Sequence, residues 1–200
     1  MGFYLSNFPA GARHYDGLRC FFTHLEGCLN MDDQNKKRYD SKIGDEYDIF
    51  NLASPYHDEI QNGVSKLLKD NLPNEEKINV VEIGFGTGIT SKVILETDSR
   101  IKLFAVDNVE KMLLKTSNSL QSFDLDRYQL TVDDALDYLK GFSANSIFIV
   151  VSVFVLHNLD KTHRYNVIKE IFRILKPGGV FITGDKIADS NPKKHKINLE

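Results

Sequence analysis

Residues 80–90 read VVEIGFGTGIT, an apolar run followed by glycines at alternate positions, Gly84, Gly86 and Gly88. The short apolar run indicates a buried strand, and the glycines indicate a turn at its end. Because glycine has no Cβ atom, such a turn also lets a ligand lie against the backbone. The stretch therefore predicts a strand, a turn and a helix. The glycines make room for a nucleotide phosphate, for another cofactor, or only for a tight turn.

Further apolar runs follow in the second half of the chain and alternate with helical segments. Strands are expected at residues 80–83, 103–106, 147–156 and 180–183, with a weaker one at 128–132. The run at 147–156, IFIVVSVFVL, shows no polar alternation, as expected of a central strand that is covered on both faces. The pattern predicts an α/β, Rossmann-like fold with a mostly parallel sheet of about five strands and helices on both faces.

The N-terminal part of the chain has a different pattern. One apolar stripe at helical spacing predicts a helix between residues 16 and 27, and a second stripe predicts a helix that stops before the segment NLPN at 71–74. We therefore expect a helical N-terminal extension over residues 1–76, a cofactor-binding core over 77–188 and a tail over 189–200.

Charge and composition exclude several classes of protein. The net charge is -3 and the pI is about 6.1, so no basic field favours nucleic acid or an anionic membrane as a partner. No segment approaches the roughly 20 apolar residues of a membrane-spanning helix, and the N-terminus lacks the features of a signal peptide. Cys20 and Cys28, with His24 between them, would be about 12 Å apart along a helix, too far to share a metal ion. We expect a cytoplasmic protein without a metal site.

Asp107 adds a second chemical clue. It ends the next expected strand after the glycine turn, where a carboxylate can accept hydrogen bonds from both hydroxyls of a ribose. The third glycine of the dinucleotide fingerprint would fall at Ile89, which counts against a pyrophosphate-binding turn. An adenosine group is therefore predicted. A ribose of NAD could donate the same hydrogen bonds to Asp107. The other alternative is that Asp107 binds no ligand and only caps the helix that follows it.

Taken together, the motifs of this chain resemble those of the class I S-adenosylmethionine-dependent methyltransferases. The resemblance covers about residues 78–185, roughly half of the chain. The motifs that carry it, in order, are EIGFGTG at 82–88, VDNVEKML at 106–113, DDA at 133–135, VSVFVLHNL at 151–159 and RILKPGG at 173–179.

The resemblance implies a cofactor, S-adenosyl-L-methionine, with S-adenosyl-L-homocysteine as its product. It implies that the glycine loop approaches the methionine portion, that Asp107 holds the ribose, and that Asp134 accepts from the adenine amino group. Glu82 either fixes the loop or meets the cofactor ammonium through water. The cofactor-binding residues that it implies are Glu82, Gly84, Phe85, Gly86, Thr87, Gly88, Asp107, Asn108, Val109, Met112, Asp133, Asp134, Ala135 and Ser152.

Methyl transfer from a sulfonium requires alignment of the acceptor and exclusion of water, but no covalent nucleophile. A general base helps when the acceptor carries a proton that must leave. His157, just past the central strand, is the candidate catalytic base, and the plain alternative is a histidine that closes the loop. Tyr47, His57 and His157 are the candidate substrate-contacting residues.

The chain departs from the family pattern at its end. The family normally adds a helix and two strands after the fifth strand, whereas this sequence ends at Glu200, soon after Asp185. We therefore expect either a truncated chain, or a partner protein or second copy that covers the open edge. The function expected from all these features is methyl transfer to a small-molecule acceptor (EC 2.1.1 class). The alternatives are an inactive cofactor-binding subunit that needs a partner protein, and an NAD-dependent oxidoreductase.

Overall fold

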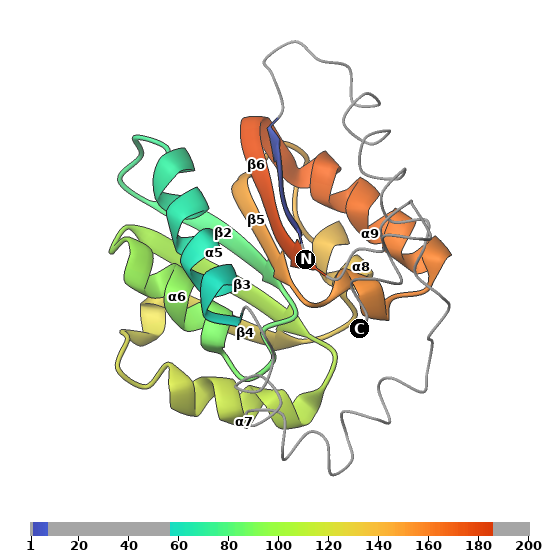
Figure 1. The fold of residues 1–200 in the computed structure, drawn as a ribbon. Helices are drawn as coiled ribbons and strands as arrows, with labels where there is room; N and C mark the ends of the chain where they lie inside the picture. The colour runs from blue at the N-terminus through green and yellow to red at the C-terminus, as the bar shows by residue number, and fades with distance from the viewer. Residues whose placement is uncertain (1, 8–56, 186–200) are drawn as a thin grey trace.

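The computed structural model describes residues 57–185, and the backbone of residues 2–7. A single sheet runs through the molecule, with helices packed on both faces (Figure 1). The predicted helix at 16–27, the Cys20, His24 and Cys28 series, the candidate substrate residue Tyr47 and the tail at 189–200 lie outside the described residues.

The described elements follow one another as a strand and then alternating helices and strands. In chain order they are β1 (Gly2–Asn7), α5 (His57–Asn71), β2 (Ile78–Ile83), α6 (Ile89–Thr97), β3 (Ile101–Asp107), α7 (Glu110–Ser119), η1 (Leu125–Arg127), β4 (Tyr128–Val132), α8 (Ala135–Lys140), β5 (Ile147–Val153), η2 (Leu156–Asn158), α9 (Lys161–Ile174) and β6 (Leu175–Asp185).

The sheet has six strands in the order β1-β6-β5-β2-β3-β4. Strands β2 to β6 are parallel to one another, as predicted, and β1 runs antiparallel to β6. The chain builds outward from β2 to β3 and β4, then crosses back to β5 on the other side of β2 and continues to β6. This reversal creates a switch point between β2 and β5, where open α/β sheets bind ligands at the carboxyl ends of the strands.

Two hydrophobic cores lie on the two faces of the sheet. Alternate residues of β2 enter different cores: Val80 packs in the core that includes α5, α6 and α7, whereas Val81 packs in the core of α8 and α9. Strand β5 is buried along nearly its whole length, which explains its uninterrupted apolar sequence. Strand β4 is an edge strand in which no residue is fully buried, and its sequence signal is correspondingly weak.

Helix α5 confirms the second predicted helix of the N-terminal extension. Its buried residues Ile60, Val64 and Leu68 recur at helical spacing and pack in the same core as α6. The helix ends at Asn71, one residue beyond the predicted end, because it includes the first residue of the NLPN segment.

Strand β1 was not predicted. Residues 2–7 fall within the region that we assigned to a helical extension, but Gly2 pairs with Asp185 and Asn7 pairs with Val180. In Figure 1 this blue strand lies along β6, on the edge that we expected a partner or missing strands to cover. The physical reason is that an open edge leaves N–H and C=O groups unpaired, and a segment of the same chain can pair with them.

Candidate cofactor-binding site

The glycine loop, residues 84–88, connects β2 to α6 and is held by hydrogen bonds from two neighbouring elements. The Gly84 N–H donates to the Val106 carbonyl at the end of β3, at 2.7 Å. Thr116 of α7 donates from Oγ1 to the Gly86 carbonyl, also at 2.7 Å. These two hydrogen bonds therefore fix the loop to β3 and α7.

Two of these glycines are required by the geometry. Gly84 has φ +78°, and a Cβ atom there would lie 2.2 Å from Cγ2 of Val155. Gly88 has φ +85°, and a Cβ atom there would lie 3.0 Å from Cγ2 of Thr116. A positive φ disfavours any other residue at both positions; in addition, Val155 leaves no space for a side chain at Gly84, and the contacts at Gly88 are tight.

Asp107, at the tip of β3, braces the glycine loop. Its Oδ2 accepts from the Gly86 N–H and its Oδ1 from the Val109 N–H, each at 2.9 Å. Burial raises the pKa of this carboxyl group above its usual range, and the hydrogen bonds from Gly86, Val109 and Asn108 act in the opposite direction. A carboxylate offers about four acceptor positions, so the group retains capacity for a ligand hydroxyl.

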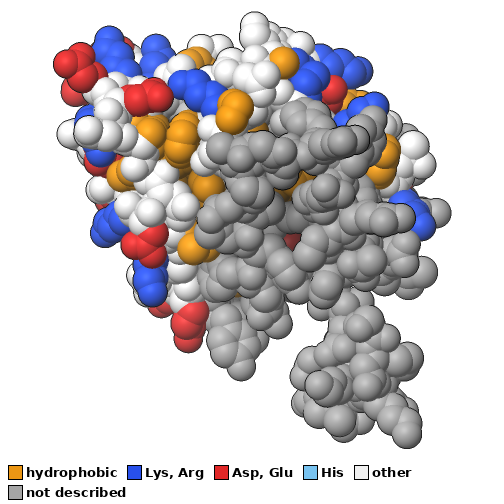
Figure 2. Space-filling model, turned by 90° about the horizontal axis from the view of Figure 1, so that it is seen from above, with side chains coloured by type: hydrophobic (Ala, Val, Ile, Leu, Met, Phe, Trp, Pro, Cys, Tyr) orange, Lys and Arg blue, Asp and Glu red, His pale blue; other side chains and the backbone are white. Residues whose placement is uncertain are grey.

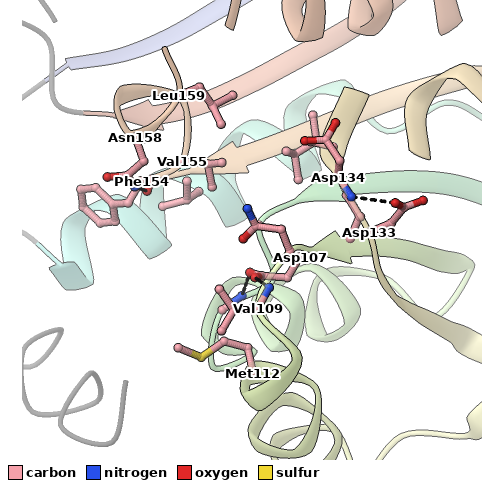
Figure 3. A pocket seen from close by; sticks show the side chains of 16 residues that line it. Asp107, Val109, Met112, Asp133, Asp134, Phe154, Val155, Asn158 and Leu159 are labelled. Atoms are coloured by element: carbon pink, nitrogen blue, oxygen red, sulfur yellow. Dashed lines mark hydrogen bonds between the residues drawn. The ribbon is translucent and has the colours of Figure 1, made fainter. Parts of the chain in front are cut away.

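A pocket opens at the carboxyl ends of β2, β3 and β5, around the switch point of the sheet. It encloses about 830 Å³ of empty space, including the open solvent at its mouth. In Figure 3, Asp107 stands between Phe154 on one side and Asp133 and Asp134 on the other, with Met112 below. The lining residues are Ile83, Gly84, Gly86, Val106, Asp107, Asn108, Val109, Met112, Asp133, Asp134, Ala135, Val153, Phe154, Val155, Asn158 and Leu159.

A smaller pocket of about 330 Å³ adjoins the first one and shares Gly84, Gly86, Val153 and Phe154 with it. It lies at the N-terminus of α6, and its other lining residues are His57, Gln61, Phe85, Thr87, Ile89 and Thr90.

Gln61 of α5 is the polar side chain that stands out in the smaller pocket. It is only 9% exposed, and its Nε2 donates to Thr90 Oγ1 at 3.1 Å. Its Oε1 is buried and has no hydrogen-bond partner among the described residues. A buried acceptor of this kind is costly unless a ligand or water donates to it.

Glu82, in β2 directly before the glycine loop, is buried at 1% exposure. Ser91 Oγ donates to its Oε2 at 2.5 Å, whereas its Oε1 has no partner within the described part of the chain. Burial raises the pKa of Glu82 to about 8; the Ser91 hydrogen bond lowers it and the charge of Asp107 raises it further. A pKa raised to about 8 favours the protonated form of Glu82 at neutral pH.

His157 lies in η2, beyond the carboxyl end of β5, and forms a pair with Asp185. Its Nδ1 is hydrogen-bonded to Asp185 Oδ1, and its backbone N–H donates to Asp185 Oδ2 at 3.2 Å. Asp185 is 1% exposed, so the carboxylate is a buried acceptor. Such an acceptor at Nδ1 favours the tautomer that carries the proton there, which leaves Nε2 as a proton acceptor.

The structure brings most of the predicted cofactor residues together. Gly84, Gly86, Asp107, Asn108, Val109, Met112, Asp133, Asp134 and Ala135 line the larger pocket. Phe85 and Thr87 line the smaller one, as does the candidate substrate residue His57. Glu82, Gly88, Ser152 and His157 line neither pocket. The Ser152 side chain is fully buried, and its Oγ has no hydrogen-bond partner among residues 57–185.

Sequence reasoning missed the contribution of the loop after β5. Phe154, Val155, Asn158 and Leu159 of this loop line the larger pocket, together with Val153, the last residue of β5. Phe154 has φ +58°, an unusual value for a bulky residue, and hydrogen bonds to Gly184 and from Asn158 hold its backbone. The motif that contains these residues was visible in the sequence, but the positive φ that directs the loop across the pocket was not.

Comparison with known proteins agrees with this geometry. A methyltransferase domain family matches residues 80–179, half of the 200-residue chain. The chain belongs to this family. Its cofactor is S-adenosylmethionine, and the site fits that group: the glycine loop leaves room beside the backbone, and Asp107 and the uncommitted Gln61 oxygen are acceptors for its donors.

Among curated proteins, the chain is similar to a carboxy-S-adenosyl-L-methionine synthase of Nautilia profundicola, with 24% identity over 86% of this chain and 71% of that protein. It is also similar to the tRNA N(3)-methylcytidine methyltransferase Mettl2 of Drosophila melanogaster, with 31% identity over 54% of this chain and 34% of that protein. The chain thus spans about a third of the length of the tRNA enzyme.

Among solved structures, the N-methyltransferase NodS of Bradyrhizobium japonicum, in complex with S-adenosyl-l-homocysteine, has a TM-score of 0.53 to this chain at 19% identity. The match covers 66% of this chain and 62% of NodS. It shows that the two proteins share the fold.

Two further features concern the described residues only. No described helix is long and apolar enough to cross a bilayer. No group of three or more His, Cys, Asp and Glu side chains in residues 57–185 could hold a metal ion.

Proposed function

We propose that this chain transfers a methyl group from S-adenosylmethionine to a small-molecule acceptor. The observation that carries the proposal is the position of Asp107, which lines the larger pocket and braces the glycine loop through Gly86. The carboxylate that would hold the ribose therefore also shapes the loop that approaches the rest of the cofactor.

The two adjoining pockets suit the two ends of the cofactor. The larger pocket, with Val109 and Met112 on its wall, would take the adenosine, because apolar side chains cover a ring face well. The smaller pocket would take the methionine end. There the N-terminus of α6 favours a carboxylate, and Gln61 Oε1 offers an acceptor to an ammonium.

Several features support a small acceptor rather than a nucleic acid. The net charge is -3, and among the described side chains visible in Figure 2, Lys and Arg are interspersed with Asp and Glu. When bound, the cofactor supplies an electrophilic methyl group. The protein then has to align the acceptor and exclude water.

His157 is the proposed general base for an acceptor that must lose a proton. Its Nδ1 contact with Asp185 leaves Nε2 to accept that proton. Because His157 lines neither pocket, the acceptor has to extend past the loop that carries Phe154 and Asn158 to reach it.

Binding of S-adenosylhomocysteine, compared with NADH, tests the cofactor assignment. We expect S-adenosylhomocysteine alone to raise the melting temperature, since only a ligand that binds the folded state does so. Asp107→Ala should lower affinity in calorimetry by about 100-fold or more, through loss of a charged hydrogen-bond acceptor and of the loop brace. Asp126→Ala removes an exposed carboxylate and is the matched control. Stabilisation by NADH instead would overturn the proposal.

Transfer of labelled methyl groups tests the acceptor class. The protein is incubated with labelled S-adenosylmethionine and either a small-metabolite extract or total tRNA, and label is expected in the metabolite fraction. His157→Gln should slow that transfer by about 100-fold or more while leaving S-adenosylhomocysteine affinity unchanged. Label in tRNA alone would refute the small-molecule proposal. Cofactor binding without transfer to either fraction would favour the inactive subunit that needs a partner.

A second candidate function follows from the relatives that match most of the chain. Those proteins are named carboxy-S-adenosyl-L-methionine synthases and align over 86% and 73% of this chain in two cases. In such a reaction S-adenosylmethionine would be a substrate and its carboxylated form the product. A carboxyl group from a carboxyl-donating co-substrate would replace one hydrogen, which would pass to the remainder of that co-substrate as a proton. The mass spectrum of cofactor extracted from the purified protein distinguishes the candidates, because only the second predicts the carboxylated form.

A further inference from the structure

Asp134, on the wall of the larger pocket, is fixed by hydrogen bonds to its backbone and side chain although the side chain is partly exposed. It precedes α8 as the N-cap residue, and its Oδ1 accepts from the backbone N–H groups of Leu136 at 2.8 Å and Asp137 at 3.3 Å. Its own N–H donates to Asp133 Oδ1 at 2.8 Å, which Figure 3 shows as a dashed line. The side chain is thereby fixed relative to the start of α8.

A histidine from another helix holds the second oxygen. His163, in the first turn of α9, places its Nε2 3.0 Å from Asp134 Oδ2. The backbone N–H of His163 is itself fixed, because it donates to Oδ1 of the α9 cap residue Asp160 at 2.9 Å. The contact therefore connects α9 to the pocket wall through one imidazole.

The number of acceptor positions limits what Asp134 can still bind. A carboxylate offers about four positions, two on each oxygen. Leu136 and Asp137 use both positions on Oδ1, and His163 uses one on Oδ2. One position is left, and it lies on the oxygen that His163 contacts.

We propose that His163 is a positioning residue that orients Asp134 Oδ2 to accept from the exocyclic amino group of the cofactor's adenine, and so selects a 6-aminopurine. This inference rests on the proposed function, in which the larger pocket holds the adenosine. Nε2–H donates both in the imidazolium and in the neutral tautomer with its proton on Nε2, so the contact does not require a charged His163.

The surroundings of this pair indicate that its loss leaves the fold intact. The His163 and Asp134 side chains are 26% and 41% exposed. Exposed pairs of this kind contribute little to stability. Asp137, a further charged group near His163, is paired with Lys140 at 2.9 Å. Removing the imidazole should therefore affect the ligand more than the folded state.

Calorimetry with two ligands tests the proposal on the full chain. The ligands are S-adenosylhomocysteine and its analogue with hydrogen in place of the adenine amino group. We expect His163→Ala to weaken binding of S-adenosylhomocysteine about fivefold to tenfold, and that of the analogue less than about twofold. His163→Gln keeps an N–H donor and should recover part of the loss. Lys169→Ala, an exposed change on the same helix, is the control for α9 and should alter neither affinity.

The outcomes separate this inference from the proposed function. If the wild-type protein binds neither ligand, the cofactor site itself is wrongly assigned. If the wild type binds both ligands equally well, no amino-group contact exists and the inference is overturned although the cofactor site stands. Equal losses for both ligands in His163→Ala would show a structural role and would overturn it as well.

Discussion

Glu82 is a carboxyl group whose surroundings favour the neutral form. It is buried in β2, and its pKa is raised from 4.5 to about 8, chiefly by burial. A buried carboxylic acid beside the glycine loop costs more free energy of folding than an apolar residue of the same size would, because a polar group loses its contact with water. Its Oε1, which lacks a partner among the described residues, remains available to a ligand or water.

The stability of the protein should therefore depend on pH through Glu82. The unfolded chain loses this proton near pH 4.5 and the folded chain near pH 8. Between these values the folded state binds the extra proton, so the free energy of unfolding falls as pH rises, and the dependence vanishes below and above the window. Glu82→Gln cannot ionise and keeps an acceptor for Ser91. Near pH 8, we expect the free energy of unfolding of Glu82→Gln to exceed that of the wild type by on the order of a few kcal/mol. Urea unfolding of both proteins at several pH values between 4.5 and about 8 measures this difference. A constant difference between the two proteins at all pH values would contradict this account.

At the scale of elements, the glycine loop packs closely against the loop that follows β5. Gly84 has φ +78° and faces Val155, so Gly84→Ala should cost about 3 kcal/mol or more through a clash and a strained backbone. Val155→Ala removes both methyl groups nearest the new Cβ and leaves the Val155 Cβ position at 3.3 Å. The double variant should therefore recover part of the loss, with the backbone strain remaining. Urea unfolding of the four proteins gives the coupling energy. If the losses in unfolding free energy of the two single variants simply add in the double variant, steric contact between the two loops does not cause the cost of Gly84→Ala.

These same elements show what the sequence could predict. The strands from β2 to β6 followed from short apolar runs, and helix α5 followed from periodicity, because each buries residues that its own sequence defines. The contacts that complete the site connect elements distant in the chain. Gln61 reaches Thr90 across 29 residues, and His157 reaches Asp185 across 28. No local pattern encodes such pairings, so a candidate such as His157 could be named while its buried partner could not.

At the scale of the whole molecule, the sheet separates the site from its outer edge. The larger pocket is formed at the ends of β2, β3 and β5, whereas β1 and β6 lie to one side. The antiparallel β1 occupies the position beside β6 where further strands of the family were expected. The sequence did not predict it, because pairing between segments so far apart in the chain leaves no periodic signal in one short strand.

Removal of β1 tests whether this strand protects the sheet. A variant that lacks residues 1–7 would expose the backbone of β6 from Val180 to Asp185. We expect a loss on the order of 1–3 kcal/mol in unfolding free energy and concentration-dependent association, because an open edge pairs with another chain. Affinity for S-adenosylhomocysteine should change less than about twofold, since the larger pocket lies at the ends of β2, β3 and β5, and β6 separates these strands from β1. The control replaces residues 2–7 with a glycine-serine segment of equal length, which keeps the chain length but weakens the strand. Light scattering after size exclusion gives the mass. A monomeric deletion variant with unchanged unfolding would show that β1 does not protect β6.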